Sequence, residues 1–276
     1  MTLERLRLDD PLWCSFVAGS RDATPFHLPV WAGLLAETYG YRAFALALRD
    51  ADGTLLAGAP MITTTRIGLR GGRAISLPFT DECPLLARDP AALRTFVDAL
   101  NRGGEPLEVR ARVDAVGWAT RAEAVVQVLD LEPDPERVLQ SFSRSQVARN
   151  IKRAEREGVS VRAATSSADL AAFYALHTRT RRRLGVPVQP RRFFDLLWSR
   201  MIEPGLGSIL LASHDGTPLA GALFLSWNGT TIYKFGASDP EGWRLRPNHA
   251  LFWTAIQASC LRGDHRFDFG LSLIHI

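Results

Sequence analysis

Apolar and polar positions along this chain follow two patterns, the helical period of about 3.6 residues and the short apolar runs of buried strands. In the first half, helical spacing predicts helices at residues 29–39 and 90–102, and glycines follow both of them. Apolar runs predict strands at residues 45–48, 74–77, 107–111 and 124–131, with a further strand after the turn at Asp52-Gly53. Helices that alternate with strands in this way are typical of an α/β fold.

The second half shows the same alternation. A long amphipathic helix is predicted at residues 136–157, where Gly158 stops it, and a strand follows at residues 159–163. Asp215-Gly216 and Asn228-Gly229 are hairpin signals. The other elements are helices at residues 168–184, 190–202 and 247–261 and strands at 207–213, 219–227, 230–235 and 267–269. From residue 159 the predicted order is β-α-α-β-β-β-α-β.

The chain also repeats itself at an offset of 163 residues. The octamer DGTLLAGA at residues 52–59 returns as DGTPLAGA at 215–222. An Asp-Gly pair between apolar runs is a common hairpin signal, so the octamer alone is compatible with coincidence. The upstream helices agree at the same offset in their apolar positions, which are Trp31, Leu34 and Leu35 against Phe194, Leu197 and Trp198. We therefore predict two copies of one α/β module, residues 1–133 and 134–276, with the boundary at Glu132-Pro133-Asp134-Pro135.

Charge is distributed unevenly between these halves. The net charge is +4, yet residues 137–200 hold 14 Lys and Arg against 4 Asp and Glu, so the remaining chain is acidic. This asymmetry predicts an anionic partner for the basic segment, although a solvated helix face explains it equally well. Arginine outnumbers lysine 31 to 2. Lys152 and Lys234 are therefore candidates for a role that needs a compact, titratable ammonium.

Composition narrows the class further. Three cysteines and six histidines are scattered without the spacing of metal ligands, so no metal site is predicted. No apolar stretch approaches the roughly 20 residues that span a bilayer, and the first residues contain no apolar signal core. We expect a cytoplasmic protein without a transmembrane segment.

Motifs in both halves resemble the FemAB-type branch of the GNAT-like acyltransferases. They are PFH at residues 25–27, SLPFTD at 76–81, FYALH at 173–177, TRRRLGVP at 180–187, WNGTTIYKFGASD at 227–239, RLRPNHALFW at 244–253 and FDFG at 267–270. The resemblance covers nearly the whole chain. Within the family, the chain is similar to the bacterial subgroup associated with exopolysaccharide and PEP-CTERM systems. It implies tandem GNAT-like domains, each a mixed, mostly antiparallel sheet flanked by helices.

The resemblance implies transfer of an acyl or aminoacyl group from an activated donor onto an amine or hydroxyl of a cell-envelope or exopolysaccharide precursor. The donor is open between aminoacyl-tRNA and acyl-CoA, and no tightly bound cofactor is implied. Residues 244–250 lack the glycines with which GNAT enzymes cradle the CoA pyrophosphate, which favours aminoacyl-tRNA. Family members continue with further elements after FDFG, so we expect a truncated second domain with an unrelated tail at residues 271–276.

Acyl transfer needs a deprotonated amine, stabilisation of an oxyanion and alignment of both substrates. Three residues are the catalytic candidates. Lys234 would stabilise the oxyanion or bind an anion, His249 would act as general base, and Asp81 would accept a proton or bind the acceptor amine from a cleft between the domains. The structural alternatives are a solvated edge-strand lysine, a packed histidine and an aspartate that caps a turn.

The candidates for donor and substrate binding form two groups. Tyr233, Arg244, Arg246 and Asn248 surround a predicted helix start, where N–H groups attract anions, although Asn248 could simply cap the helix. Basic residues upstream could bind phosphates of tRNA, a polyanionic glycan or a lipid-linked precursor: Arg149, Lys152, Arg181 and Arg182. The rival function is a non-catalytic nucleic-acid-binding or scaffold protein, but we expect residues 137–200 to lack the interleaved exposed aromatics that stack on bases. No DNA partner is expected.

Overall fold

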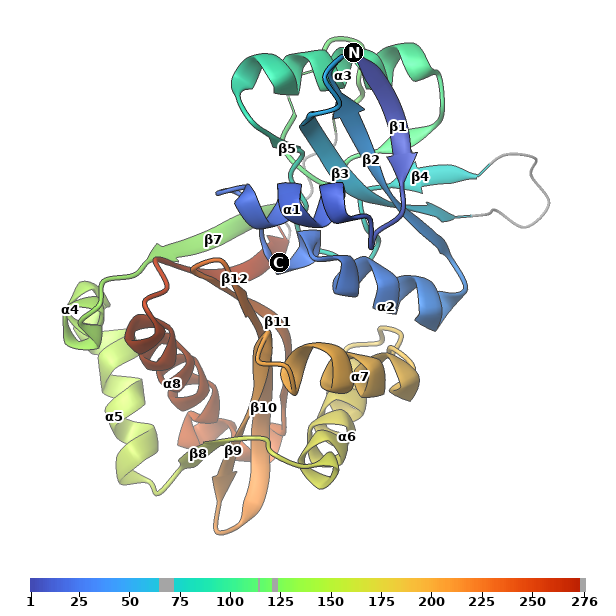
Figure 1. Cartoon of the computed structure of the whole chain (residues 1–276). Coiled ribbons are helices and arrows are strands. Elements are labelled where there is room, and N and C mark those ends of the chain that lie inside the picture. The colour runs from blue at the N-terminus through green and yellow to red at the C-terminus, as the bar shows by residue number, and fades with distance from the viewer. Residues whose placement is uncertain (65–71, 114, 121–123, 274–276) are drawn as a thin grey trace. The chain divides into compact units, whose positions relative to one another are not determined.

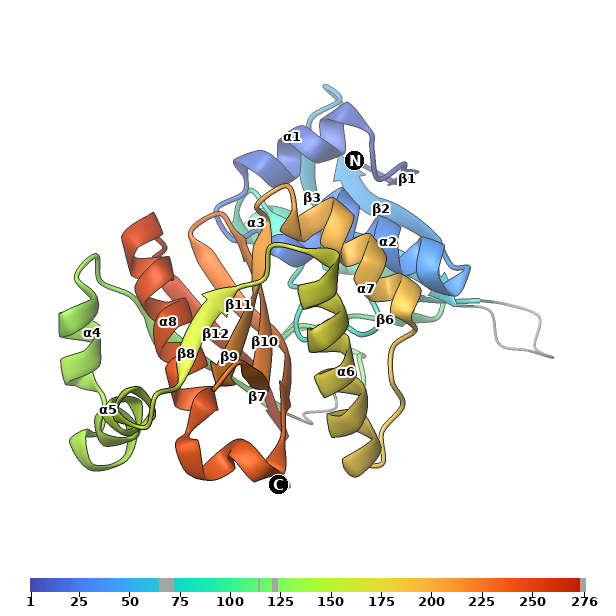
Figure 2. The same ribbon diagram turned by 90° about the horizontal axis from the view of Figure 1, so that it is seen from below.

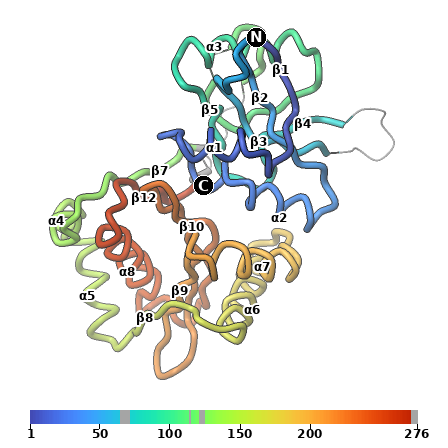
Figure 3. Tube along the Cα trace, viewed as in Figure 1, coloured from blue at the N-terminus to red at the C-terminus, as the bar shows by residue number. Residues whose placement is uncertain are grey.

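The computed structural model describes the chain except for residues 65–71, 114, 121–123 and 274–276 (Figures 1 and 3). Residues 274–276 of the expected tail therefore lie outside the described part. The chain forms two compact units, residues 1–122 and 123–276, and each is described by itself. Within the described residues, no helix combines the length and apolar character needed to cross a membrane.

The first unit is a mixed sheet flanked by helices. Its elements are β1 (Thr2–Leu6), α1 (Pro11–Gly19), a 3₁₀ turn (Pro25–His27), α2 (Pro29–Tyr39), β2 (Arg42–Arg49), β3 (Leu55–Thr64), β4 (Arg73–Ile75), β5 (Leu86–Ala87), α3 (Pro90–Gly103) and β6 (Leu107–Glu108). The strand order is β1-β2-β3-β4-β6, and β5 pairs with β3. Strands β4 and β6 are parallel because α3 crosses over between them, and the other neighbours are antiparallel.

Local chemistry explains where the helices of this unit begin and end. The carboxylates of Asp10 and Asp89 accept hydrogen bonds from the first turns of α1 and α3, and a proline follows each of them. Helices α2 and α3 end at Gly40 and Gly104, both in the left-handed conformation. These signals are local in sequence, so α2 and α3 were predicted close to their observed bounds.

The second unit repeats the plan of the first. Its elements are β7 (Ala124–Asp130), α4 (Pro135–Ser141), a π-helical turn (Arg144–Ala148), α5 (Arg149–Arg156), β8 (Ser160–Ala163), α6 (Ser167–Arg183), α7 (Arg191–Leu197), a second π-helical turn (Trp198–Ile202), β9 (Gly207–His214), β10 (Thr217–Trp227), β11 (Thr230–Ser238), a 3₁₀ segment (Pro240–Leu245), α8 (Pro247–Arg262) and β12 (Arg266–Leu273). The strand order is β7-β12-β11-β10-β9-β8. Helices α6 and α7 cover one face of the sheet, and α4, α5 and α8 cover the other (Figure 2).

The two units share one topology. In the second unit, β8 to β12 follow each other across the sheet in the same order as β1, β2, β3, β4 and β6 in the first, with one helical crossover before the last strand of each series. Strands β7 and β5 are the additions. The predicted duplication and the predicted fold class, tandem mixed sheets flanked by helices, are therefore confirmed.

The repeated octamers form equivalent hairpins, β2–β3 and β9–β10. Each contains a glycine beneath an aromatic ring of a helix, α1 in the first unit and α6 in the second. A Cβ on Gly58 would lie 2.9 Å from the ring of Trp13, and a Cβ on Gly221 would lie 2.7 Å from the ring of Phe173. Both rings are fully buried. The identical glycine in the two copies is thus explained by the close approach of helix and strand in each unit.

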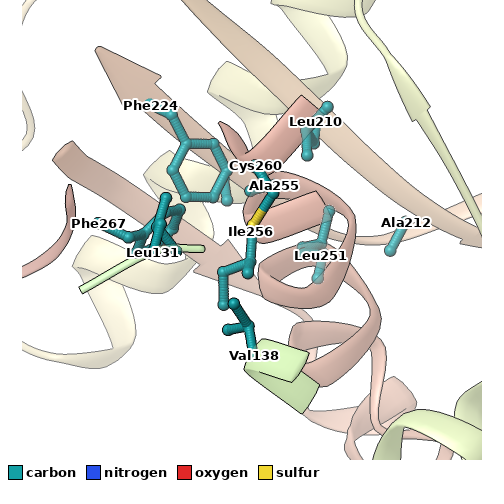
Figure 4. Packing of buried hydrophobic residues seen from close by; sticks show 12 residues of the cluster. Leu131, Val138, Leu210, Ala212, Phe224, Leu251, Ala255, Ile256, Cys260 and Phe267 are labelled. Carbon is teal, nitrogen blue, oxygen red and sulfur yellow. The ribbon is translucent and has the colours of Figure 1, made fainter. Parts of the chain in front are cut away.

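The core on the α8 face of the second sheet joins segments far apart in the chain (Figure 4). Phe224 and Phe267 extend from the sheet, and Leu251 and Ile256 extend from α8. Two further buried members are Leu131, which precedes α4, and Val138, which lies in α4. Packing of this kind fixes α8, and with it the start of α8, against the centre of the sheet.

One strand was assigned to the wrong unit by the sequence analysis. The strand predicted at residues 124–131 was placed in the first domain, but β7 pairs antiparallel with β12, Phe267 opposite Leu129. The boundary of the units accordingly precedes β7 rather than following it. Apolar runs identify a strand but carry no information about its partner, which depends on distant contacts.

The continuous helix predicted at residues 136–157 was also wrong. Helix α4 ends at Ser141, and Phe142 is extended, with φ −79° and ψ 155°. Ser143 then begins a new helical segment, because its hydroxyl accepts a hydrogen bond from the N–H of Gln146. The break lets Phe142 pack against the core. Serine at a cap competes with helix continuation, and the amphipathic pattern hid this signal.

Candidate functional site

Strands β11 and β12 run side by side for three residue pairs. Residues 230–232 pair in parallel with residues 266–268. Further along, β11 continues against β10 as far as Ser238, and β12 continues against β7 as far as Leu273. The backbone ladder is therefore interrupted in the centre of the sheet, at the carboxyl ends of both strands. Such a break leaves backbone donors and acceptors for a ligand.

A β-bulge lies on β11 at this interruption. Tyr233 pairs with Phe224 of β10 and Phe235 pairs with Leu223, so Lys234 is the extra residue between them. Side chains alternate along a strand with period two, and an inserted residue therefore sends its two neighbours to opposite faces. The bulge places Lys234 outside the regular ladder at the point where β11 and β12 separate.

Aromatic packing records this change of face. The Tyr233 ring lies 4.7 Å from the ring of Phe252 on α8. The Phe235 ring lies on the other face, 5.5 Å from the rings of Phe194 on α7 and His177 on α6. Both neighbours of Lys234 are thus held by packing, which fixes the backbone of the bulge.

The phenol of Tyr233 is held at the end of β11. A Cβ on Gly236 would overlap the Tyr233 hydroxyl, so the glycine provides the space that the phenol occupies. Burial raises the pKa of Tyr233, and the positive charge of Arg181 opposes this rise. Tyr233 is therefore protonated at neutral pH and can donate a hydrogen bond.

Lys234 is half-buried, and its Nζ lies 5.5 Å from the ring centroid of Phe235. A cation near the face of an aromatic ring is stabilised electrostatically. The structure thus places an ammonium at the bulge, within an otherwise apolar and aromatic strand. The solvated edge-strand lysine that was the structural alternative does not fit, because β11 lies inside the sheet with β10 and β12 on either side.

The chain enters α8 through a turn that carries two exposed arginines, Arg244 and Arg246. Arg246 adopts the left-handed conformation, with φ 60° and ψ 39°, which favours glycine. Residue 246 therefore makes the turn that a glycine would make, although residues 244–250 contain none. The first turn of α8 and the two guanidinium groups form an end of the helix that attracts anions.

His249 lies in the first turn of α8, half-buried, with its Nε2 3.4 Å from Nδ2 of Asn150 on α5. Burial lowers the pKa of His249, and the charge of Arg246 lowers it further. The imidazole is therefore neutral at neutral pH, which is the form that a general base requires. This contact joins the basic segment, through Asn150, to α8, through His249, although the two residues are 99 positions apart.

The second unit has an apolar groove at the start of α8 and a basic groove along α5. The first, of about 310 Å³, is almost entirely apolar and is lined by Phe142, Val147, Ile151, Asn248, His249, Phe252, Trp253, Ile256 and Phe269. The second, of about 750 Å³, is basic and is lined by residues of α4, the π-helical turn and α5, including Arg144, Arg149, Lys152, Arg153, Arg156 and Glu157. Glu157 lies near Arg153 and Arg156, at 3.8 Å and 3.6 Å. Within the described residues, Arg144, Arg149 and Lys152 have no carboxylate partner.

Asp81 lies in the first unit, in the loop between β4 and β5. Buried side chains hold this loop. His27 donates a hydrogen bond from Nε2 to the carbonyl of Pro84 at 2.8 Å, and Trp31 donates from Nε1 to Oγ1 of Thr80 at 2.8 Å. Two non-glycine residues of the loop keep the left-handed conformation, which needs such anchoring: Leu77 and Phe79, with φ 62° and 60°.

The predicted residues thus fall into five places. Tyr233 and Lys234 flank the break in the sheet, and the remaining candidates are Arg244, Arg246, Asn248 and His249 at the start of α8, Arg149 and Lys152 in the basic groove, Arg181 and Arg182 at the end of α6, and Asp81 in the first unit. Sequence reasoning missed Asn150, which contacts His249, and the aromatic lining of the apolar groove. No local signal marks Asn150, because its partner comes from a distant helix.

A family model described as the acetyltransferase (GNAT) domain matches residues 141–272. This stretch contains the bulge, the divergence of β11 and β12, and α8. The second unit is GNAT-like.

Similar solved structures extend the likeness over both units. FemX matches with a TM-score of 0.76 and 15% identity, covering 100% of this chain and 90% of that chain. L-PGS from Bacillus licheniformis matches with a TM-score of 0.57 and 16% identity, covering 99% and 80%. A tandem GNAT protein from the clavulanic acid biosynthesis pathway matches with a TM-score of 0.53 and 13% identity, covering 100% and 90%. At such low sequence identity, these structural matches establish the fold and nothing more. No curated protein sequence matches the chain significantly.

Proposed function

We propose that this chain is an acyltransferase of the FemAB type. It moves an acyl or aminoacyl group from an activated donor, aminoacyl-tRNA or acyl-CoA, onto an amine or hydroxyl of a cell-envelope or exopolysaccharide precursor. The observation that carries the proposal is the bulge at Lys234, where β11 and β12 separate beside α8. The match of residues 141–272 to an acetyltransferase (GNAT) domain supports the same reaction type.

In this proposal the reacting carbonyl lies at the bulge. The ammonium of Lys234 stabilises the oxyanion of the tetrahedral intermediate, since a fixed cation in a half-buried site acts more strongly than one in water. The protonated phenol of Tyr233 donates a hydrogen bond to the donor's leaving group. His249, neutral at neutral pH, accepts the proton that the acceptor nucleophile loses.

The start of α8 and its arginines bind phosphate of the donor in this scheme. Arg244, Arg246 and Asn248 surround the helix end, and the left-handed turn at Arg246 is compatible with a CoA pyrophosphate despite the missing glycines. Side chains of the basic groove, Arg149 and Lys152, fit the longer phosphate backbone of a tRNA. Both donors therefore remain in the proposal.

Arg181 and Arg182 bind the anionic part of the precursor, and Asp81, on the anchored loop of the first unit, binds the acceptor amine. We place the reaction in the bacterial cytoplasm, with the exopolysaccharide-associated subgroup as the setting and without a DNA partner. A second function, non-catalytic RNA binding, is favoured by one observation, the unpaired cations of the basic groove.

The two lysines of the chain test the proposal. Lys234→Ala is expected to lower kcat by about 100-fold or more without lowering the melting temperature, because one oxyanion-stabilising group contributes that much. Lys152→Ala, as the matched control, is expected to raise the KM for a tRNA donor and to leave kcat unchanged.

The assay is acyl transfer to an amino-sugar precursor, after a screen for donors by thermal stabilisation with CoA, acyl-CoA and charged and uncharged tRNA. Stabilisation by acyl-CoA alone selects that donor, and stabilisation by charged tRNA selects the other. Unchanged kcat in the Lys234→Ala enzyme would overturn the role of Lys234. Salt-sensitive tRNA binding without transfer to any acceptor would favour the non-catalytic function.

A further inference from the structure

Three large apolar side chains are exposed together at one end of the second unit. Leu184 and Val186 follow the last turn of α6 and are 61% and 38% exposed, and Trp243, in the 3₁₀ segment before α8, is 49% exposed. We call residues 179–186 and 239–246 the amphipathic tip. The C-terminal end of α6 lies at the lower edge of Figure 2.

Hydrogen bonds join the two segments of the tip at Ser238. Arg183 donates from its guanidinium to the Ser238 carbonyl at 3.1 Å, and Trp243 donates from Nε1 to Oγ of Ser238 at 2.9 Å. The Arg183 guanidinium also lies over the Trp243 ring, 5.1 Å from its centroid. The indole N–H of Trp243 therefore has its hydrogen-bond partner within the protein, so the exposed ring can leave water without losing a hydrogen bond.

The loop after α6 is equally well defined. Gly185 is left-handed, with φ 67°, and the N–H of Val186 donates to the carbonyl of Arg181 at 3.1 Å. This turn directs Leu184 and Val186 away from the core, although α6 has a buried face nearby. Grouped with Trp243, these exposed aliphatic side chains form an apolar surface of the kind that is buried on binding.

Cations surround these apolar groups. The tip contains six arginines, Arg179, Arg181, Arg182, Arg183, Arg244 and Arg246, against two acidic residues, Asp239 and Glu241. Asp239 pairs with Arg179 at 3.4 Å. Arg182, Arg183, Arg244 and Arg246 are exposed. The surface thus combines aliphatic and indole groups with an excess of positive charge.

We propose that the amphipathic tip docks this protein on the surface of an anionic lipid bilayer. Exposed aliphatic groups beside arginines and a tryptophan are the chemistry of interfacial binding, in which apolar side chains enter the headgroup region and cations bind acidic lipids. An RNA partner would use the arginines and stack on Trp243 but would gain nothing from Leu184 and Val186. The charge of the tip therefore complements a bilayer, and its aliphatic groups favour that partner over a soluble polyanion.

Docking in this way has a consequence for the site already described. Residues 239–246 lead directly into α8, so the tip is continuous with the start of that helix. A membrane surface at the tip would bring lipid-linked molecules beside Arg244 and Arg246. The tip shares Arg182, Arg244 and Arg246 with the proposed donor and precursor binding, and the test below therefore measures vesicle binding without any reaction.

The experiment is co-sedimentation of the full chain with vesicles of phosphatidylcholine, with and without phosphatidylglycerol. We expect binding to the anionic vesicles and little binding to phosphatidylcholine alone. Leu184→Ser combined with Val186→Ser is expected to weaken binding about fivefold or more, because two aliphatic groups lose their apolar environment. Arg182→Gln combined with Arg244→Gln is expected to weaken it by roughly fivefold for each arginine.

A matched control is Leu261→Ser. Leu261 is 79% exposed at the opposite end of α8, so its replacement removes an exposed leucine without touching the tip. Binding of this variant should equal that of the unaltered chain, and equal far-ultraviolet circular dichroism and melting temperatures verify folding of all variants, whose altered residues are exposed.

Three results would overturn the proposal. Equal binding to vesicles with and without phosphatidylglycerol would show that the arginines do not recognise anionic lipid. Equal loss in the Leu261→Ser variant would show non-specific hydrophobic adsorption. Unchanged vesicle binding in the Leu184→Ser, Val186→Ser variant, with binding abolished by competing tRNA, would assign the arginines to a nucleic acid instead. If vesicle binding persists as expected while acyl transfer is absent, the docking surface stands and the proposed function fails.

Discussion

His27 should make the stability of the first unit depend on pH. The side chain is fully buried, and its Nδ1 accepts a hydrogen bond from the N–H of Thr24 at 2.9 Å while its Nε2–H donates to Pro84. Both bonds require the neutral imidazole with its proton on Nε2, because a carbonyl can only accept. Burial lowers the pKa of His27 to about 4 from the ordinary 6.5, although the hydrogen bond to Pro84 opposes this shift.

The sign follows from proton binding. Between the two pKa values the unfolded chain binds a proton at His27 and the folded chain does not, so acidification favours unfolding. The contribution is negligible above the unfolded pKa and grows as pH falls from 6.5 towards 4. At about pH 4.5, linkage gives a loss of about 2.5 kcal/mol in the free energy of unfolding relative to about pH 7.

The comparison is between the unaltered chain and His27→Gln, whose amide does not titrate. Urea unfolding at the two pH values, read from peptides of the first unit by hydrogen-exchange labelling, measures the free energy of unfolding of that unit. The variant loses stability at both pH values, but we expect its loss on acidification to be smaller by about 2 kcal/mol. Other titrating groups are common to both proteins and cancel.

Two results would refute this reasoning. The first is an equal pH dependence in the two proteins. The second, which does not depend on the variant folding, is an NMR titration of His27 in the unaltered chain that gives a pKa near the ordinary value. Either would mean that water reaches His27, and the anchoring of the loop that carries Asp81 would then need another explanation.

The remaining predictions concern the repeated glycines and the start of α8. Gly58→Ala and Gly221→Ala should each destabilise their own unit by about 1–3 kcal/mol, because the added methyl overpacks a buried ring. Gly33→Ala, inside α2 with open space around it, should instead stabilise the first unit by about 0.5–1 kcal/mol. Urea unfolding that showed the same sign for all three substitutions would contradict the packing argument. Arg246→Gly should keep the left-handed turn and remove a charge that lowers the pKa of His249, so an NMR titration should show that pKa rising towards 6.5, whereas an unchanged value would mean that burial alone sets it.

Much of the fold could be predicted because its signals are local. The hairpins at Asp52-Gly53 and Asp215-Gly216, the glycine after α2 and the helix that begins at Pro247 depend on residues within one turn of each other. The repeated octamer predicted the duplication before any contact was known. The elements at the N-terminus, β1 and α1, were missed, since charges interrupt the apolar residues of β1 and α1 is only nine residues long.

The candidate site was predicted less completely. The motifs indicated Tyr233, Lys234 and the start of α8, but nothing in them indicated that Lys234 is an extra residue in its strand. A bulge is defined by the register against the neighbouring strand, which the sequence of β11 does not contain. Likewise, the glycine-poor loop suggested a departure from the GNAT turn, whereas Arg246 adopts the left-handed conformation itself.

The sequence by itself determined the alternation of helices and strands, the two copies of the module and the residue types available for acyl transfer, because periodicity, caps and turns depend on near neighbours. Only the tertiary structure decided that β7 joins the second sheet, that β11 and β12 separate after Ile232, and that Asn150 meets His249. Each of these depends on contacts between residues far apart in the chain, where the packing of whole faces outweighs local preference.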